Sequence, residues 1–369
     1  MARILVNLLQ STGTKGGIEI YARELYTQLG GMDSGHEFVG LASRELAAKG
    51  ADWFPGRLID SGISGENRFA WARGELFGVS RFARREGVDL IHGPAMFGPL
   101  RSSIPVVISI HDLLYFSHPE LMQTKLFTGP VKWMERRGAA GAARFITISQ
   151  FSARAIQKYL GVPADRIDVI PLAGRATATG VHTRPADGQS LFLAMGQRSP
   201  YKDFPTVIRA WSHIPEASRP RLVVTGSHGD DPLMPLVAEL GLERWVDLKS
   251  WVSNEELAQL LGSATALIDS TLATGFSMPT LESMAIGLPT LLADNEILRE
   301  VGGEAADYFA PGDPIDLARA VQQLASDPAR QDELSTLGLA RAATFSWEKV
   351  AVGTLDTFDR VLSERAARS

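Results

Sequence analysis

The chain has 369 residues, of which 45% are hydrophobic and 21% charged, as in a folded globular protein long enough for two hydrophobic cores. It has no cysteine, so disulfides, thiolate metal sites and cysteine nucleophiles are excluded. The net charge of −5 is unevenly spread: residues 1–180 carry 21 Lys+Arg against 16 Asp+Glu, and residues 181–369 carry 16 against 26. The basic half is compatible with an anionic surface or substrate, whereas the overall balance does not favour nucleic acid as a partner.

Short apolar runs alternate with longer amphipathic segments through the first half of the chain. The expected strands are Ile4–Leu9, Phe38–Leu41, Asp89–His92, Val106–Ile110, Phe145–Ser149 and Asp168–Leu172. The helical patterns between them include Gly17–Leu29, Asn67–Glu86 and Gln150–Leu160. This alternation predicts a doubly wound parallel sheet with helices on both faces, a Rossmann-like α/β domain over residues 1–175.

The segment Gly174–Ser190 has small residues and no apolar period, which is the composition of a linker. The alternation then restarts and predicts a second Rossmann-like domain over residues 176–345. Its expected strands are Leu191–Met195, Leu222–Thr225, Val246–Leu248, Ala266–Asp269 and Pro289–Ala293. Its expected helices are Phe204–Ile214, Asn254–Leu261, Thr280–Ile286, Ile315–Ala325 and Ala329–Leu339.

Residues 346–369 read as a final helix. Ser346 is suited to cap it, and Trp347, Val350, Thr354 and Phe358 recur on one face at helical spacing. No stretch of the chain reaches the roughly 18 apolar residues that a membrane-spanning helix needs. We therefore expect a cytoplasmic protein.

Loops that follow parallel strands are where ligands bind in open α/β sheets. The first such loop contains the pair Gly16 and Gly17 at a helix start, where backbone can approach a phosphate or sugar; a bland flexible loop is the alternative. The pair His111-Asp112 follows another strand, where a carboxylate can orient an imidazole towards a sugar hydroxyl. A packed, hydrogen-bonded pair is the alternative there.

A third loop, Gly275–Glu282, joins the strand Ala266–Asp269 to a helix. Its free N–H groups and the helix dipole suit an anion, and Glu282, one turn in, suits two ribose hydroxyls. A first-turn glutamate that merely favours the dipole is the alternative for Glu282. Lys202, with Arg198 in the same loop, begins another helix, where a cation is more easily explained by a bound anion than by local stability. These residues predict a grip on a nucleoside diphosphate.

The whole chain resembles the family-4 retaining glycosyltransferases of the GT-B fold, particularly their bacterial mannosyltransferase-like members. The matching segments are GGIEIYARELYTQL, VVISIHDLLYFSHPEL, ITISQFSARAIQKYLGVPADRIDVIPL, AMGQRSPYKDFPTVIRAW, GFSMPTLESMAIGLPTLLAD and FAPGDPIDLARAV. The resemblance implies two Rossmann-like domains facing a central cleft, with the last helix crossing back to the first domain. It also implies a hexosyltransferase that moves a mannose-like or deoxy sugar from a nucleoside-diphosphate sugar, GDP-linked favoured, to a glycan or lipid-linked acceptor in surface polysaccharide or lipopolysaccharide synthesis.

The resemblance also assigns roles to matching positions. The residues implied to be catalytic are His111 near the sugar's C6 hydroxyl, Lys202 and Arg198 on the phosphates, and Glu282 on the ribose. Those implied to bind the donor are Gly16, Gly17, Gln197, Trp251, Val252, Thr274, Gly275, Phe276, Ser277 and Met278. Trp251 and Val252 would border the base, and Ser277 and Met278 would present N–H groups to the phosphates. We expect no metal and no cofactor besides the donor substrate.

Three positions depart from the family pattern. Thr274 stands where the family carries the first of two glutamates, Ser277 replaces a glycine, and Gln197 replaces an arginine for which Arg198 is a possible substitute. The departures leave a second hypothesis open, a non-catalytic nucleotide-sugar-binding pseudoenzyme.

A basic amphipathic pattern over residues 68–85 suggests peripheral docking on an anionic membrane, at the inner face of the cytoplasmic membrane. A helix packed on the first domain with a solvated basic face is an equally good interpretation of this pattern.

Overall fold

The computed structural model describes residues 1–13, 16–122, 125–175, 182 and 190–367. The chain divides into two compact units. Unit 1 comprises Met1–Pro119, Thr124–Leu172 and Ser346–Ser369, and unit 2 comprises Glu120–Gln123 and Ala173–Phe345. The sequence places the corresponding boundary between residues 175 and 176.

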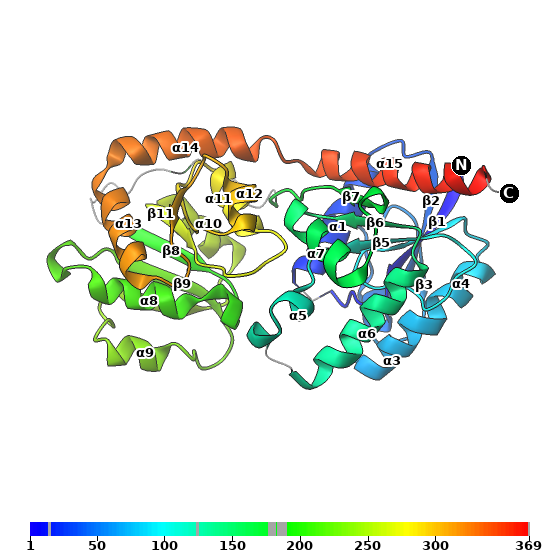
Figure 1. The fold of residues 1–369 in the computed structure, drawn as a ribbon, viewed down its shortest axis with the longest axis horizontal. Helices are drawn as coiled ribbons and strands as arrows, with labels where there is room; N and C mark the ends of the chain where they lie inside the picture. Colours follow the sequence, from blue (N-terminus) through cyan, green and yellow to red (C-terminus); the bar gives the residue numbers. More distant parts are fainter. Residues whose placement is uncertain (14–15, 123–124, 176–181, 183–189, 368–369) are drawn as a thin grey trace. The chain divides into compact units, whose positions relative to one another are not determined.

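Unit 1 is built on a seven-stranded parallel sheet with the strand order β3-β2-β1-β4-β5-β6-β7 (Figure 1). The strands are β1 (Ala2–Leu8), β2 (His36–Ala42), β3 (Arg57–Asp60), β4 (Leu90–Gly93), β5 (Val106–Ile110), β6 (Arg144–Thr147) and β7 (Ile167–Val169). The sequence missed β3, because this short edge strand has a half-exposed pattern with only two apolar residues. The order reverses between β1 and β4, which places the switch point of the sheet there.

Apart from α15, which follows unit 2 in the chain, the helices of unit 1 lie between these strands in sequence, as a doubly wound fold requires. They are α1 (Gly17–Gly30), α2 (Arg44–Lys49), α3 (Arg68–Arg73), α4 (Val79–Arg85), α5 (Leu114–Ser117), α6 (Lys125–Gly141), α7 (Gln150–Leu160) and α15 (Trp347–Ala366). The predicted helix 67–86 is present as α3 and α4 joined by a π-helical turn, Gly74–Gly78. Asn67 caps its start, since its side chain accepts hydrogen bonds from the N–H groups of Phe69 and Ala70.

Unit 2 is built on a six-stranded parallel sheet with the order β10-β9-β8-β11-β12-β13. The strands are β8 (Leu191–Met195), β9 (Arg221–Ser227), β10 (Val246–Ser250), β11 (Ala266–Asp269), β12 (Thr290–Ala293) and β13 (Asp307–Phe309). The helices are α8 (Phe204–His213), α9 (Met234–Glu239), α10 (Asn254–Ser263), α11 (Met278–Ala285), α12 (Glu296–Gly302), α13 (Pro314–Ser326) and α14 (Pro328–Ala342). The sequence missed β13, α9 and α12, which are too short to show a clear period.

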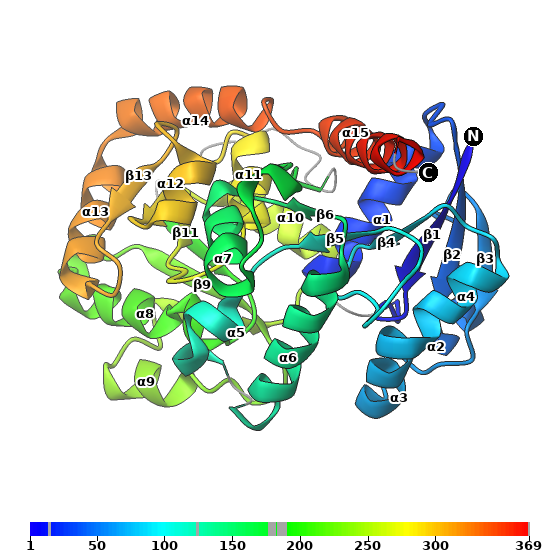
Figure 2. The same ribbon diagram turned by 45° about the vertical axis from the view of Figure 1, so that its right-hand side comes forward.

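In unit 2, α8 and α11 pack against different helices, and α13 also contacts α14. α8 packs against α13, whereas α11 packs against α12 and α14 (Figure 2). Right-handed crossovers that run in opposite directions from a switch point place their helices on opposite faces of a parallel sheet. The strand order reverses between β8 and β11, so the loops that leave the carboxyl ends of these two neighbours share one edge.

α15 completes unit 1 by packing against α1 (Figure 1). The Ser346 side chain caps it, accepting a hydrogen bond from Lys349 N–H at 3.2 Å. On its buried face, Val350, Thr354 and Phe358 are each 0% exposed, and the Phe358 ring lies 5.1 Å from the His92 ring. The last predicted helix therefore forms, and three of its four marked positions are fully buried.

Replacing Phe358 by alanine should lower the free energy of unfolding by roughly 3–5 kcal/mol, because it removes buried apolar area and leaves a cavity. Val352, on the same helix, is 43% exposed. Val352→Ala is therefore the matched control and should stay within about 0.5 kcal/mol of wild type. Denaturant unfolding of both variants tests this, and equal midpoints would contradict the packing described for α15.

Candidate functional site

Lys202 lies in the loop after β8, and its side chain reaches the loop after β11 at the switch point of unit 2. Lys202 Nζ donates a hydrogen bond at 3.1 Å to the hydroxyl of Thr271, in the loop after the neighbouring strand β11. Gly196, at the start of the first loop, has φ +138°, and a Cβ there would lie 3.2 Å from Lys202 Cε. Glycine is favoured here by its backbone conformation, and a Cβ would also crowd the lysine side chain.

The loop between β11 and α11 ends in a helix cap whose backbone N–H groups are partly without protein acceptors among the described residues. Ser277 caps α11, with its Oγ accepting from Thr280 N–H at 3.4 Å, and is 1% exposed. Among the residues that the structure describes, the N–H groups of Gly275, Ser277 and Met278 donate to no protein acceptor. Unpaired N–H groups at a helix start, with a lysine on the adjoining loop, form an anion-binding arrangement.

Ser277 does not project a hydroxyl into this arrangement. Its Oγ donates to the Asp269 carboxylate at 2.6 Å, so the side chain that replaces the family's glycine is directed into the protein interior. Thr274 is also satisfied locally, since its Oγ1 donates to Phe276 O at 2.6 Å. The Phe276 ring is buried and lies 6.1 Å from the Phe345 ring.

Arg198 does not fit its predicted role as a phosphate ligand. Its side chain is 7% exposed and pairs with Asp231, with Nη2 to Oδ2 at 2.7 Å. Nε donates to the same carboxylate, Nη1 to the carbonyls of Gly196 and Thr225, and Nη2 also to that of Val224. All five N–H donors of the guanidinium are therefore occupied, and Arg198 instead fastens the β8 loop to β9. Gln197, beside it, is exposed.

Glu282 lies just beyond the first turn of α11 and is 3% exposed. Its carboxylate is held by Arg175: Oε1 accepts from Arg175 Nε at 2.7 Å and from Arg175 N–H at 3.2 Å, and Oε2 accepts from Nη2 at 3.1 Å. A carboxylate offers about four acceptor positions, so Oε2 can accept a further hydroxyl. Arg175 thus fixes the orientation of the glutamate, a partner that the sequence did not reveal.

Two aromatic side chains form a platform at the carboxyl ends of β9 and β10. The Trp251 ring, 65% exposed, stacks on the His228 ring with centroids 5.5 Å apart and planes 13° apart. Val252, next in the chain, is half-buried. An exposed flat pair of this kind offers a face on which a nucleobase can stack.

In unit 1, the glycine pair begins α1 as predicted. Gly16 is the cap residue, Gly17 opens the helix, and a Cβ at Gly16 would meet nothing within 4 Å. The carboxylate of Glu19 lies at this helix start, where it accepts from Gly13 N–H at 2.6 Å and from Thr12 N–H at 3.3 Å. Part of the loop's donor capacity is therefore already used by the protein's own anion.

His111 is 6% exposed and lies edge-on to Tyr21, with ring centroids 4.5 Å apart. Burial lowers the pKa of His111 to about 4, so the imidazole is neutral at pH 7. Its Nε2 has no hydrogen-bond partner among the described residues. Asp112 does not hold the ring as the sequence suggested, because its carboxylate accepts from Leu114 N–H at 3.1 Å instead. A buried nitrogen without a partner is consistent with a ligand contact.

A buried acid that the sequence did not single out lies on α6. Glu135 is 2% exposed, and neither carboxylate oxygen has a hydrogen-bond partner among the described residues. Burial, and then repulsion by Asp112, raise the pKa of Glu135 to about 8. The side chain is therefore mostly protonated at neutral pH.

Glu135 should make the folded state less stable as the pH rises. Between about pH 4.5 and pH 8, the folded chain keeps the proton on Glu135, whereas the unfolded chain loses it. The stability that Glu135 contributes is therefore complete below about pH 4.5 and is lost as the pH rises through about 8. Between pH 5 and pH 9, wild type should lose on the order of 1–3 kcal/mol of its free energy of unfolding through Glu135, and Glu135→Gln should not show this loss. Thermal unfolding across this range measures it, with the exposed Glu66→Gln as control. Identical pH profiles for Glu135→Gln and wild type would refute the assignment.

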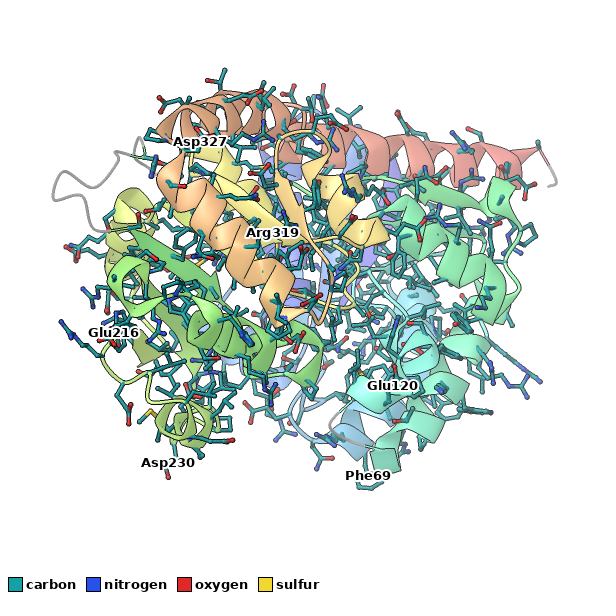
Figure 3. The ribbon with its side chains drawn as sticks, turned by 60° about the vertical axis from the view of Figure 1, so that its left-hand side comes forward. Phe69, Glu120, Glu216, Asp230, Arg319 and Asp327 are labelled. Atoms are coloured by element: carbon teal, nitrogen blue, oxygen red, sulfur yellow. The ribbon has the colours of Figure 1, made fainter. Side chains whose placement is uncertain are left out.

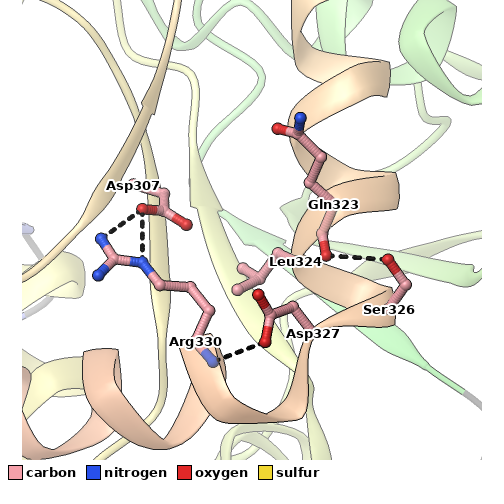
Figure 4. Close-up of a pocket in the computed structure, with 6 residues that line it drawn as sticks. All are labelled: Asp307, Gln323, Leu324, Ser326, Asp327 and Arg330. Carbon is pink, nitrogen blue, oxygen red and sulfur yellow. Dashed lines mark hydrogen bonds and ion pairs between the residues drawn. The ribbon is translucent and has the colours of Figure 1, made fainter.

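One hollow of unit 2 is lined by residues outside these loops. A polar hollow of about 490 Å³ in unit 2 is lined by Asp307, Gln323, Leu324, Ser326, Asp327 and Arg330 (Figure 4). Its arginine is already paired with Asp307, with Nη2 to Oδ1 at 2.7 Å, so it offers a ligand little. No cluster of three or more metal-ligating side chains occurs among the described residues.

Sequence reasoning missed the partners that position the site, namely Arg175, Asp231, Asp269 and Thr271. One signal was available for Asp269, which ends an otherwise apolar strand at the switch point. The other three are recognisable only once the fold brings distant segments together.

Models of known families match both halves of the chain. "Glycosyltransferase Family 4" matches residues 15–173, and "Glycosyl transferases group 1" matches residues 181–338. The O-antigen chain mannosyltransferase B of Escherichia coli is 28% identical over 75% of this chain and 76% of its own length. The MMP alpha-(1->4)-mannosyltransferase of Mycolicibacterium hassiacum is 27% identical over 77% of this chain and 73% of its own.

The fold has close counterparts among solved structures. The sucrose-phosphate synthase of Thermosynechococcus elongatus superposes with a TM-score of 0.79, covering 99% of this chain and 100% of its own at 18% identity. The two parallel-sheet units and the two family matches agree with one another. The chain belongs to the family-4 glycosyltransferases of the GT-B fold and is a hexosyltransferase.

Proposed function

We propose that this glycosyltransferase moves a mannose-like hexose from a nucleoside-diphosphate sugar, with GDP as the favoured nucleotide, to a glycan or lipid-linked acceptor. The observation that carries the proposal is the set of unpaired N–H groups at Gly275, Ser277 and Met278 on the loop that Lys202 contacts. The names of the two relatives, both mannosyltransferases, support the choice of sugar. O-antigen synthesis by one of them supports a surface polysaccharide as the product.

The proposed reaction retains the configuration at the sugar's anomeric carbon. The bond between that carbon and the diphosphate breaks, and Lys202 with the loop's N–H groups stabilises the charge that develops on the leaving oxygen. The acceptor hydroxyl attacks from the same face, and its proton passes to the departing phosphate. His111, neutral and with a free Nε2, is suited to accept from a sugar hydroxyl.

A thermal-shift panel with GDP, UDP, dTDP and ADP, alone and with matching sugars, tests the donor. A ligand that binds only the folded state raises the melting temperature with its concentration, so GDP should give the largest shift. A larger shift with another nucleotide would correct the base, and no shift with any of the four would refute the proposal. Sugar transfer by wild type that Lys202→Ala lacks would also exclude the pseudoenzyme alternative.

We further propose that unit 1 docks on an anionic membrane, which would bring a lipid-linked acceptor within reach at the inner face of the cytoplasmic membrane. Phe69, at 85% exposed, projects from α3 into solvent, as Figure 3 shows. Phe77 is 59% exposed and Trp133, on α6, is 47% exposed. The segment that contains Leu100 is hydrogen-bonded to the turn between α3 and α4, because Leu100 N–H donates to Leu76 O at 3.1 Å.

A groove of about 560 Å³ lies between residues 100–102 and α6, and it combines aromatic with basic side chains. It is lined by Leu100, Arg101, Ser102, Trp133, Arg137, Ala140 and Gly141. Arginines beside exposed aromatic rings suit the boundary between lipid headgroups and acyl chains. In the described part of the chain, no helix is both apolar and long enough to traverse a bilayer.

Replacing Phe69 and Trp133 together by serine should reduce binding to phosphatidylglycerol vesicles at low salt by about tenfold, because two apolar anchors are lost. Ile315, 65% exposed on α13 of unit 2, provides the control Ile315→Ser, which should bind as wild type does. Co-sedimentation measures both. The docking proposal would be refuted if wild type does not bind phosphatidylglycerol vesicles, or if it binds phosphatidylcholine vesicles equally well.

A further inference from the structure

The last residue of β11 places a buried carboxylate inside the loop that forms the proposed phosphate site. Asp269 is 6% exposed. Its carboxylate accepts from Thr271 N–H at 3.1 Å, Ser277 Oγ at 2.6 Å and Thr280 Oγ1 at 3.3 Å, and also from the Thr271 hydroxyl. Burial works to raise the pKa of Asp269, but Lys202 and the surrounding hydroxyls outweigh burial and hold the pKa below its ordinary value. The carboxylate is therefore charged at neutral pH.

Thr271 links this carboxylate to Lys202. A hydroxyl has one proton, which Thr271 donates to Asp269, so its oxygen is free to accept the 3.1 Å hydrogen bond from Lys202 Nζ. The backbone is fixed across the same two loops: Ser270 Oγ donates to Lys202 O at 2.6 Å, and Leu272 N–H donates to Tyr201 O at 2.8 Å. The loop after β11 thus sets where the ammonium lies.

The second carboxylate oxygen of Asp269 fixes the start of α11. Ser277 Oγ donates to Asp269 Oδ2 while it accepts from Thr280 N–H, so one side chain both caps the helix and is oriented by the aspartate. This leaves the N–H groups of Ser277 and Met278 without protein acceptors in the described chain. One buried group therefore organises both halves of the anion site.

We propose that Asp269 is a positioning residue of the transferase site, which sets Lys202 through Thr271 and the α11 cap through Ser277 before the diphosphate binds. The inference rests on the proposed function. The negative charge of Asp269 by itself repels a diphosphate, but it is balanced by Lys202 and by four hydrogen bonds. Asp269 favours binding because Lys202 and the N–H groups at the start of α11 are already in place when the diphosphate arrives. This preorganisation improves the affinity for the diphosphate and the stabilisation of the leaving group.

The test compares Asp269→Asn and Thr271→Val with wild type in the binding of GDP and guanosine, by titration calorimetry with guanosine measured by competition. Both variants should weaken GDP binding at least tenfold and change guanosine binding less than twofold, because the network reaches the phosphates but not the base or ribose. Thr271→Ser, which keeps the hydroxyl, should restore GDP binding to within twofold. Asp316→Asn is the control: this aspartate holds another loop, accepting from Ala310 N–H at 2.8 Å, and should leave both ligands unaffected.

Several outcomes would overturn the inference. GDP binding by Asp269→Asn that equals or exceeds wild type would mean that the carboxylate only repels the ligand. Equal losses for GDP and guanosine would mean general damage to the unit. If circular dichroism shows Asp269→Asn unfolded, the neutral and nearly isosteric Thr271→Val decides by the same criteria. If wild type prefers UDP, the same comparison is made with UDP and uridine in place of GDP and guanosine. If wild type binds no nucleoside diphosphate, both the proposed function and this inference fail. If wild type binds the nucleotide and the variants bind it equally well, only the inference fails.

Discussion

Replacing Lys202 by alanine should lower kcat for sugar transfer by roughly 10²–10³-fold, the effect of removing one preorganised donor from a developing negative charge. The lysine is half-buried and is aimed by Thr271 at the switch point of unit 2. The fold should survive, because no core contact is removed. Donor KM should rise as well, since the ground-state diphosphate already carries charge.

Lys249 provides the matched control for Lys202. It lies in the same unit and pairs on the surface with Glu256, with Nζ to Oε1 at 3.0 Å. Lys249→Ala should leave kcat and KM within about twofold of wild type, since exposed pairs contribute little. Initial rates with a saturating donor decide the matter. Near-normal turnover by Lys202→Ala would count against the site in unit 2, whatever the nucleotide turns out to be.

Replacing Glu282 by alanine should lower kcat/KM for the donor by roughly 10–100-fold, because hydrogen bonds to a charged acceptor contribute about 1.5–3 kcal/mol. The sharper readout is selectivity. Wild type should bind GDP about tenfold more tightly than 2′-deoxy-GDP, and Glu282→Ala should bind the two equally. A first-turn glutamate that only favours the helix dipole would leave the preference for the ribonucleotide intact.

Arg175 separates two explanations of a Glu282 effect. The guanidinium and backbone of Arg175 make three hydrogen bonds to this carboxylate, so Glu282→Ala also disturbs the segment that carries the arginine. Arg175→Ala leaves the carboxylate in place and should keep at least part of the preference for GDP over 2′-deoxy-GDP. If Arg175→Ala abolishes that preference as completely as Glu282→Ala does, the arginine contacts the ribose or is indispensable for orienting the glutamate.

Most of the fold could be predicted from the sequence because buried parallel strands are apolar runs between amphipathic helices. The elements that escaped lack such a pattern. The edge strand β3 presents Arg57 and Asp60 to solvent, and β13 is only three residues long. The π-helical turn inside the helix 67–86 continues the helix without a break, and no proline interrupts the segment, so the sequence predicts one continuous helix there.

The site was predictable to a different degree. Glycines, a helix cap and a lysine at a helix start are local signals, and they led to Lys202 and the loop before α11. The sequence cannot tell what a side chain is paired with. Arg198 looked available for phosphate and is fully engaged by Asp231 and backbone carbonyls, whereas Asp269 looked like the end of a strand and organises the loop. Arg198 and Asp231 are 33 residues apart in the sequence, and the two loops joined by Lys202 and Thr271 are 69 residues apart, so no local pattern reveals these pairings.

The position of α15 in the chain has a consequence for synthesis. The whole sheet of unit 1 precedes the sheet of unit 2 in the chain, yet the last helix of unit 1, with Phe358 at its buried face, follows the whole of unit 2. A ribosome adding about 5–20 residues per second needs on the order of 10–30 s to pass through Ala173–Phe345. During that interval the surface of α1 that α15 later covers stays open to water and to holding chaperones, so the unit begun first is the one finished last.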